Sequence, residues 1–134
     1  GEDLGWPRDA WSFSSWVPRL VVIHLGINDF VGKAAQPASQ DAFAERYAQF
    51  LQALRGRYPG ARFVLMSTTD WPYGLLRPAV EKVMQRQTAA GHQDTTHLHY
   101  DMQGDALHWH PSVKQHEYIA ARLIELIDRE KLLR

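Results

Sequence analysis

Apolar residues follow two different periods along this chain, and the two periods alternate. Short runs with few interruptions, such as LVVIHL and RFVLMS, have the length of strands. Between them lie longer stretches in which apolar residues recur at the helical period, as on one face of a helix. The expected strands cover residues 20–25, 62–67 and 95–100, and the expected helices cover residues 41–58, 76–91 and 112 onward. Alternation of this kind predicts parallel strands joined by right-handed crossovers, and hence an α/β fold.

The first expected strand ends abruptly in Gly26-Ile27-Asn28-Asp29. Its near-continuous apolar character is typical of a strand that is covered on both faces. Open α/β folds bind ligands beyond the carboxyl ends of their strands. Gly26 lets the backbone approach a ligand closely, and the Asn28 side chain offers an amide donor suited to a developing oxyanion. Asn-Asp after a strand is also ordinary turn chemistry, with Asp29 tying down its own turn, so the motif alone leaves both interpretations open.

A second group of polar residues precedes the last expected helix. Ser112 and Gln115 have the spacing of a capping box, which fixes the helix start and holds the preceding loop rigid. That loop carries two histidines that could act as a general base. His108 stands three residues after Asp105, whereas His110 precedes a proline next to the helix. The alternative is that both histidines only cap or pack the loop.

Composition narrows the possible functions. The 134 residues suffice for one domain, and 15 basic residues balance 15 acidic ones without a basic stripe, so nucleic acid is not an expected partner. There are no cysteines, and no apolar run reaches the roughly 20 residues of a membrane span. His97 and His99 share one side of a strand but lack a third ligand at a telling spacing, so we expect neither a metal nor another cofactor. His24 interrupts an apolar strand and is interpreted as a core histidine.

Two blocks together carry a resemblance to a known family. The first is WSFSSWVP at residues 11–18 leading into VVIHLGINDF, and the second is WHPS at residues 109–112. With these blocks the chain resembles the SGNH (GDSL-type) hydrolases, and within them the acetyl esterases of carbohydrate esterase family 2. The resemblance implies a three-layer α/β/α, flavodoxin-like fold with a parallel sheet, and a secreted or periplasmic protein. It also implies that Gly26 and Asn28 form the oxyanion hole and that His110, which has the following proline, is the catalytic base. Asp105 and His108 remain candidate partners of that base.

One part of the family pattern is missing from this sequence. The nucleophile of the family is the serine of a Gly-Asp-Ser block at the end of the first strand, well upstream of the Asn-Asp motif. Nothing before Leu20 fits that block, and Ser12, Ser14 and Ser15 lie in a Trp-rich segment rather than on a strand-to-helix elbow. We therefore interpret residues 1–134 as the carboxyl-terminal part of a single SGNH hydrolase domain, incomplete in this chain. The chain alone is expected to be inactive and to expose an apolar sheet edge.

The functional prediction follows from this resemblance. The complete protein is expected to be a serine esterase that removes acetyl or other small acyl groups from carbohydrate esters, with the nucleophilic serine outside this chain. Asp29, Trp71 and Trp109 are the expected substrate-lining residues. The expected partners are an acylated carbohydrate or small ester, and either the missing amino-terminal segment or another copy of the chain. The alternative is a non-catalytic module of the same fold that binds glycans or a partner.

Overall fold

The computed structural model describes residues 12–30, 39–69 and 74–134. Within these residues the secondary structure alternates between strands and helices, as the sequence pattern predicts. The elements are β1 (Leu20–Ile23), α1 (Ile27–Phe30), α2 (Gln40–Arg57), β2 (Arg62–Thr68), α3 (Leu76–Ala89), β3 (Thr95–Tyr100), the 3-10 turn η1 (Leu107–Trp109) and α4 (Val113–Arg129).

The three strands form one parallel sheet in the order β1-β2-β3. Val22 of β1 pairs with Val64 of β2, and Leu65 of β2 pairs with His97 of β3. The predicted parallel α/β fold is therefore confirmed. The first strand is shorter than expected, because it ends at Ile23 and the chain then turns toward α1.

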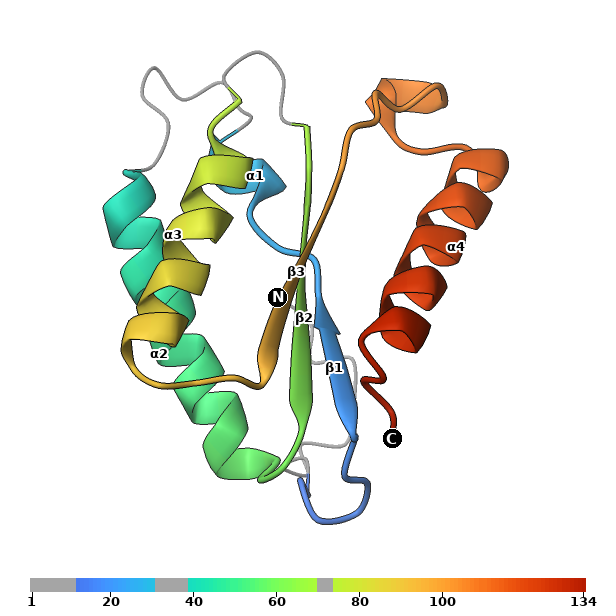
Figure 1. The fold of residues 1–134 in the computed structure, drawn as a ribbon. Coiled ribbons are helices and arrows are strands. Elements are labelled where there is room, and N and C mark those ends of the chain that lie inside the picture. The colour runs from blue at the N-terminus through green and yellow to red at the C-terminus, as the bar shows by residue number, and fades with distance from the viewer. Residues whose placement is uncertain (1–11, 31–38, 70–73) are drawn as a thin grey trace, which may run out of the picture.

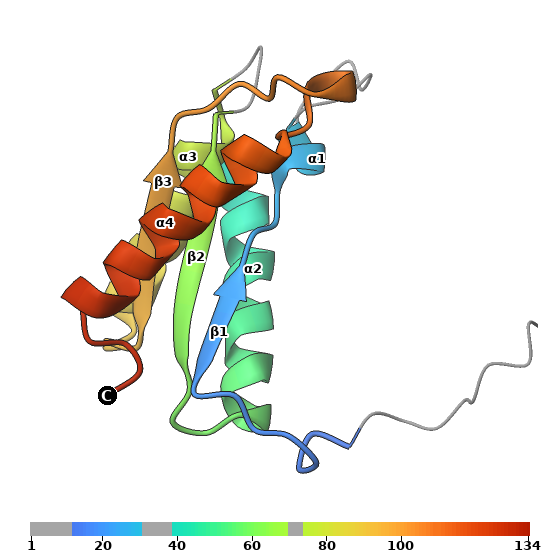
Figure 2. The same ribbon diagram turned by 90° about the vertical axis from the view of Figure 1, so that its right-hand side faces the viewer.

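Helices cover the sheet on two sides (Figure 1). α2 and α3 lie together against one face, and α4 crosses the other (Figure 2). β2 is the central strand, and its side chains alternate between two cores: Phe63 and Leu65 pack under α2 and α3, whereas Val64 and Met66 pack toward α4. Burial of both faces explains why the sequence of β2 is a nearly continuous apolar run.

The edge strand β1 departs from the expectation that it is covered on both faces. Val21 and Ile23 pack into the core under α2 and α3, but Val22 points to the opposite face and is 40% exposed. α4 crosses that face mainly over β3. β1 pairs with β2 alone among the strands that the structure describes, so an apolar strand stands at the open edge of the sheet.

The carboxyl ends of the strands gather the segments that the sequence singled out. α1 follows β1 at this end, and the β3–α4 loop, residues 101–112, runs across the same end before α4 begins (Figure 1). In the described parts of the chain, no helix combines the length and apolarity needed to cross a membrane.

Candidate active site

Gly26 occupies the turn between β1 and α1 in a conformation that other residues rarely adopt. Its φ is +112°, and it is buried. A Cβ built on Gly26 would lie 2.6 Å from Leu76 Cδ1 and 2.7 Å from Phe43 Cζ. The Asp29 amide donates a hydrogen bond of 3.0 Å to the Gly26 carbonyl and closes the turn. A glycine is therefore required here by backbone geometry and by close packing.

Asn28 and Asp29 are exposed side chains on the short helix α1. A cavity of about 560 Å³ opens beside them, between the end of β1 and the first half of α2. Its wall is mostly apolar and includes Leu25, Ile27 and Phe50. The amide of Asn28 thus stands at the rim of a hollow of small-molecule size, as expected for a residue that contacts a substrate.

Tyr47, His24 and Arg46 are further polar residues that line this cavity. Tyr47 is 5% exposed, and its hydroxyl is buried without a hydrogen-bond partner. Burial raises the pKa of Tyr47 above its usual range. His24 is exposed rather than part of the core, so its interpretation as a core histidine is wrong; its Nε2 lies 3.4 Å from the hydroxyl of Tyr100. Burial of part of the ring lowers the pKa of His24.

The β3–α4 loop holds its histidines in a strained turn. His108 and Trp109 both have left-handed backbone angles, with φ of 53° and 63°. The Gly104 backbone passes so close to the Trp109 carbonyl that a Cβ at Gly104 would overlap it. The Ala106 amide donates to the His110 carbonyl at 3.0 Å, which closes the turn on itself. Strain of this kind persists only where the surroundings fix the backbone, and it is common at functional sites.

Gln115 supplies much of that support from the first turn of α4. The predicted capping box is confirmed, since Ser112 and Gln115 cap the helix reciprocally. Gln115 Oε1 also accepts from the Asp105 amide at 3.1 Å, and its Nε2 donates to the Gln103 carbonyl at 3.0 Å. One glutamine side chain therefore joins both arms of the loop to the helix start.

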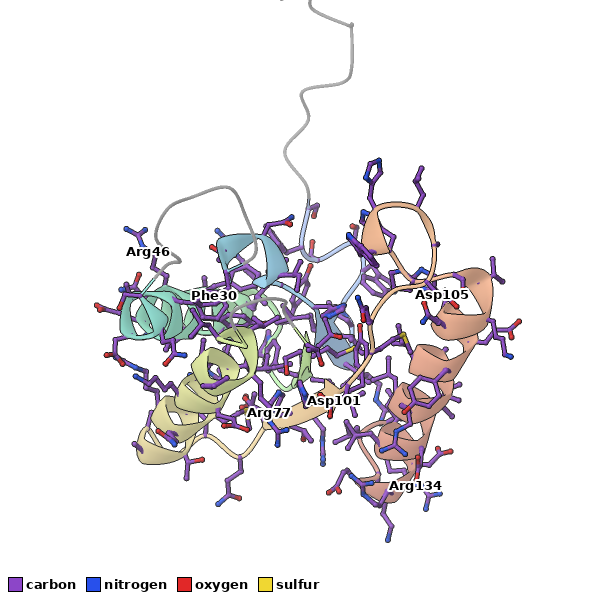
Figure 3. The ribbon with its side chains drawn as sticks, turned by 90° about the horizontal axis from the view of Figure 1, so that it is seen from above. Phe30, Arg46, Arg77, Asp101, Asp105 and Arg134 are labelled. Carbon is purple, nitrogen blue, oxygen red and sulfur yellow. The ribbon has the colours of Figure 1, made fainter. Side chains whose placement is uncertain are left out.

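The ring side chains at residues 108–110 of this loop face solvent. His108 and His110 are exposed, and Trp109 is 75% exposed. Figure 3 looks down on this end of the sheet and places Asp105 on the part of the loop next to α4. Asp105 donates its backbone amide to Gln115 Oε1, and the roles of its carboxylate and of His108 as partners of His110 stay predictions.

The structure brings the two predicted groups to the same end of the sheet. α1, with Asn28, and the β3–α4 loop, with His110, both lie beyond the carboxyl ends of the strands (Figures 1 and 2). The serines at 12, 14 and 15 precede β1 in an exposed turn at the opposite end of the sheet. There Ser12 Oγ contacts Ser14 Oγ at 2.9 Å, and Ser15 Oγ donates to the Ser12 carbonyl at 2.7 Å. Trp71, a predicted substrate-lining residue, lies outside the described residues.

Sequence reasoning missed a polar cluster under the start of this loop. Ser67 of β2 lies between His97 and His99 of β3, and His99 in turn contacts Asp101. The expectation that both histidines share one side of β3 is correct, because both rings contact the same hydroxyl. In the part of the chain that the structure describes, no group of three or more histidines, cysteines and acidic residues is placed to hold a metal ion.

Comparison with known proteins identifies the class of protein to which this site belongs. Residues 3–118 match the GDSL-like Lipase/Acylhydrolase family, and the chain belongs to this family. Its fold is that of the SGNH hydrolases, as predicted.

Individual relatives narrow this class. The chain is 32% identical over 120 residues to the cellulase/esterase CelE of Acetivibrio thermocellus, a match that spans 84% of this chain and 14% of that protein. It is 26% identical over 133 residues to an acetylxylan esterase / glucomannan deacetylase of Cellvibrio japonicus, spanning 93% of this chain and 37% of that protein.

Solved structures agree with these relatives. A family two carbohydrate esterase from Clostridium thermocellum in complex with cellohexaose is 29% identical, with a TM-score of 0.78 over 90% of this chain and 38% of that chain. An acetyl xylan esterase from the rumen bacterium Butyrivibrio proteoclasticus shares the fold at 17% identity and a TM-score of 0.73. The chain is thus similar to carbohydrate esterases but spans well under half of their length.

Proposed function

We propose that this chain is the carboxyl-terminal part of a serine esterase domain that removes acetyl or other small acyl groups from carbohydrate hydroxyls. The observation that carries the proposal is that α1, which borders a cavity, and the β3–α4 loop lie at the same end of the sheet. An oxyanion donor on α1 and an imidazole on the loop then serve the same ester. The similarity to carbohydrate esterases supports the substrate class.

Each residue has one role in the proposed reaction. A serine outside this chain attacks the ester carbonyl carbon, and His110 takes the hydroxyl proton. The carbonyl oxygen becomes an oxyanion, which accepts hydrogen bonds from the Gly26 amide and the Asn28 side chain. His110 then gives its proton to the departing sugar oxygen, and the C–O bond breaks. Water repeats the sequence on the acyl-serine, which releases the carboxylic acid and restores the serine.

The nucleophile is assigned outside this chain for a structural reason. The turn with Ser12, Ser14 and Ser15 lies at the far end of the sheet from Asn28. The open edge of β1, where Val22 is 40% exposed, is the place where a further strand can add. We propose that an amino-terminal segment pairs there and brings the serine to the carboxyl end of the sheet.

Ester cleavage by the longer polypeptide that contains this segment tests the assignment. Asn28→Ala is expected to lower kcat on an aryl acetate by about 10²–10³, because one oxyanion donor is lost. His110→Ala is expected to abolish turnover, and His108→Ala, two residues away in the same loop, is the matched control. Retention of activity within twofold in Asn28→Ala would reject the oxyanion role. Loss of turnover in His108→Ala with activity retained in His110→Ala would exchange the base.

The isolated chain provides a second test, which also addresses the non-catalytic alternative. Without the nucleophile it is expected to hydrolyse an aryl acetate at the background rate. Hydrolysis above background by this chain would overturn the assignment of the serine to another segment. A longer polypeptide that binds acetylated oligosaccharide but leaves the ester intact would favour the binding module.

A further inference from the structure

A continuous series of hydrogen bonds connects β2 and β3 to the first residue of the β3–α4 loop. Ser67 Oγ lies 2.8 Å from His97 Nε2 and 2.8 Å from His99 Nδ1. The other nitrogen of the second ring, His99 Nε2, lies 3.1 Å from Asp101 Oδ1. That carboxylate oxygen also accepts from Thr69 Oγ1 at 2.9 Å. The Ser67 hydroxyl and both ring nitrogens of His99 therefore have a partner.

The chemistry of the partners fixes the direction of these bonds. An ionised carboxylate only accepts, and the hydrogen bonds from His99 and Thr69 lower the pKa of Asp101, so His99 Nε2 carries the proton. In a neutral His99 ring, Nδ1 is then the acceptor, and the Ser67 hydroxyl donates to it. The Ser67 oxygen in turn accepts from His97 Nε2. The bonds therefore run one way, from His97 through Ser67 and His99 to Asp101.

Burial distinguishes this series from a second catalytic triad. Ser67, His99 and Asp101 have the connectivity of Ser-His-Asp, but Ser67 is 0% exposed and its hydroxyl is occupied by both rings. No ester can reach it. The other end of the series is open to solvent, because the Asp101 side chain is 81% exposed and is held by hydrogen bonds rather than by packing.

Asp101 is also the residue at which β3 ends and the β3–α4 loop begins. The other end of the loop is fixed by the reciprocal capping of Ser112 and Gln115 at the start of α4. His99 thus anchors the first residue of a loop whose last residues include His110. Small displacements of a catalytic group are costly, and about 1 Å can lower a rate by about 10².

We propose that His99 is a positioning residue, which fixes the β3–α4 loop, and with it His110, by holding Asp101 through Nε2 while Ser67 sets the tautomer of its ring. The inference rests on the proposed function, because it assigns His110 as the base. It adds a residue that does not touch the substrate and acts through the loop.

Two substitutions at His99 separate its two hydrogen bonds. A glutamine amide reaches the place of Nε2, so His99→Gln keeps the donor to Asp101 and loses the contact with Ser67. An asparagine amide reaches the place of Nδ1, so His99→Asn keeps the acceptor for Ser67 and loses the contact with Asp101. Each variant loses one bond in a half-buried site, so a purely structural role lowers activity and melting temperature alike in both.

In the longer polypeptide, His99→Asn is expected to lower kcat on an aryl acetate by about tenfold or more, with KM within about twofold. His99→Gln is expected to restore kcat to within about twofold of the wild type. His97→Asn is the matched control, because His97 contacts Ser67 but not Asp101. Equal impairment of the two His99 variants, or wild-type kcat in both, would overturn the proposal.

A readout without substrate keeps this test apart from the proposed function. In ¹⁵N NMR spectra of the histidine rings of the isolated chain at pH 8, His99 and His97 are both expected to carry the proton on Nε2. His99→Asn is expected to shift the backbone amides of residues 102–106, and His99→Gln is expected to leave them in place. A proton on His99 Nδ1, or equal loop shifts in both variants, would refute the positioning role. A wild-type polypeptide that cleaves no ester would refute the proposed function and leave this measurement decisive for His99.

Discussion

Replacing Gly26 by alanine tests why a glycine stands at the end of β1. Its φ of +112° belongs to a region that L side chains rarely adopt, which costs about 1–3 kcal/mol. The new Cβ would also lie 2.6 Å from Leu76 Cδ1 and 2.7 Å from Phe43 Cζ. Leu76 has little room to withdraw because it is fully buried, and the Phe43 ring, which borders the cavity, is held by edge-on packing against Phe30 and Tyr47. Overpacking of this kind costs about 1–3 kcal/mol.

Together the two effects predict that Gly26→Ala lowers the free energy of unfolding by about 2–6 kcal/mol, a large part of the roughly 5–15 kcal/mol of an ordinary domain. Urea unfolding of the chain, followed by far-ultraviolet circular dichroism, measures this loss. Gly56→Ala is the matched control, because Gly56 lies in α2 and its added Cβ meets nothing within 4 Å. That variant is expected to gain about 0.5–1 kcal/mol. A loss below about 1 kcal/mol for Gly26→Ala, or equal losses in both variants, would refute the steric account.

Three further predictions concern other parts of the fold. Arg55 donates two hydrogen bonds to the Asp94 carboxylate, at 2.6 and 2.7 Å. Arg55→Lys is therefore expected to lower the free energy of unfolding in urea by about 1.5–3 kcal/mol. An unchanged value would mean that one ammonium contact suffices. Ser112→Ala removes the cap of α4 and is expected to cost about 0.5–2 kcal/mol by the same measurement, with no loss if the helix needs no cap. Burial, followed by the charge of His99, lowers the pKa of His97 from its ordinary 6.5. The unfolded chain then binds a proton at His97 more tightly than the folded chain does. The stability that neutral His97 contributes is therefore fully present above about pH 6.5 and is lost as the pH falls toward the lowered pKa. Melting temperatures between pH 7.5 and 5 measure this decline, which is expected to be shallower in His97→Gln; identical slopes would refute it.

Features that depend on neighbours in sequence were predictable. The capping box of α4 was found from Ser112 and Gln115 alone, because both partners lie within one helical turn. β3 was predicted at residues 95–100 from alternation over six positions, and it has those bounds in the structure. Gly26-Ile27-Asn28-Asp29 was recognised as a turn for the same local reason.

Features that depend on distant segments were not predictable. Ser67 and His99 are 32 residues apart, and only the parallel register that pairs them allows the hydroxyl to join two rings. His24 was interpreted as a core residue because it stands in an apolar run. The strand ends at Ile23, however, so His24 falls in the turn and faces the cavity beside Tyr47.

The sequence by itself determined that this chain is an α/β protein with an amide donor after its first strand and an imidazole before its last helix. Local periodicity, turn chemistry and capping carry that information, because each acts over a few residues. The tertiary structure alone decided that both segments lie at one end of the sheet, that β1 is the strand at the apolar edge, and that the loop begins at a series of hydrogen bonds around the buried Ser67. Those relations arise only when the strands pair, since pairing sets which side chains from distant segments come into contact.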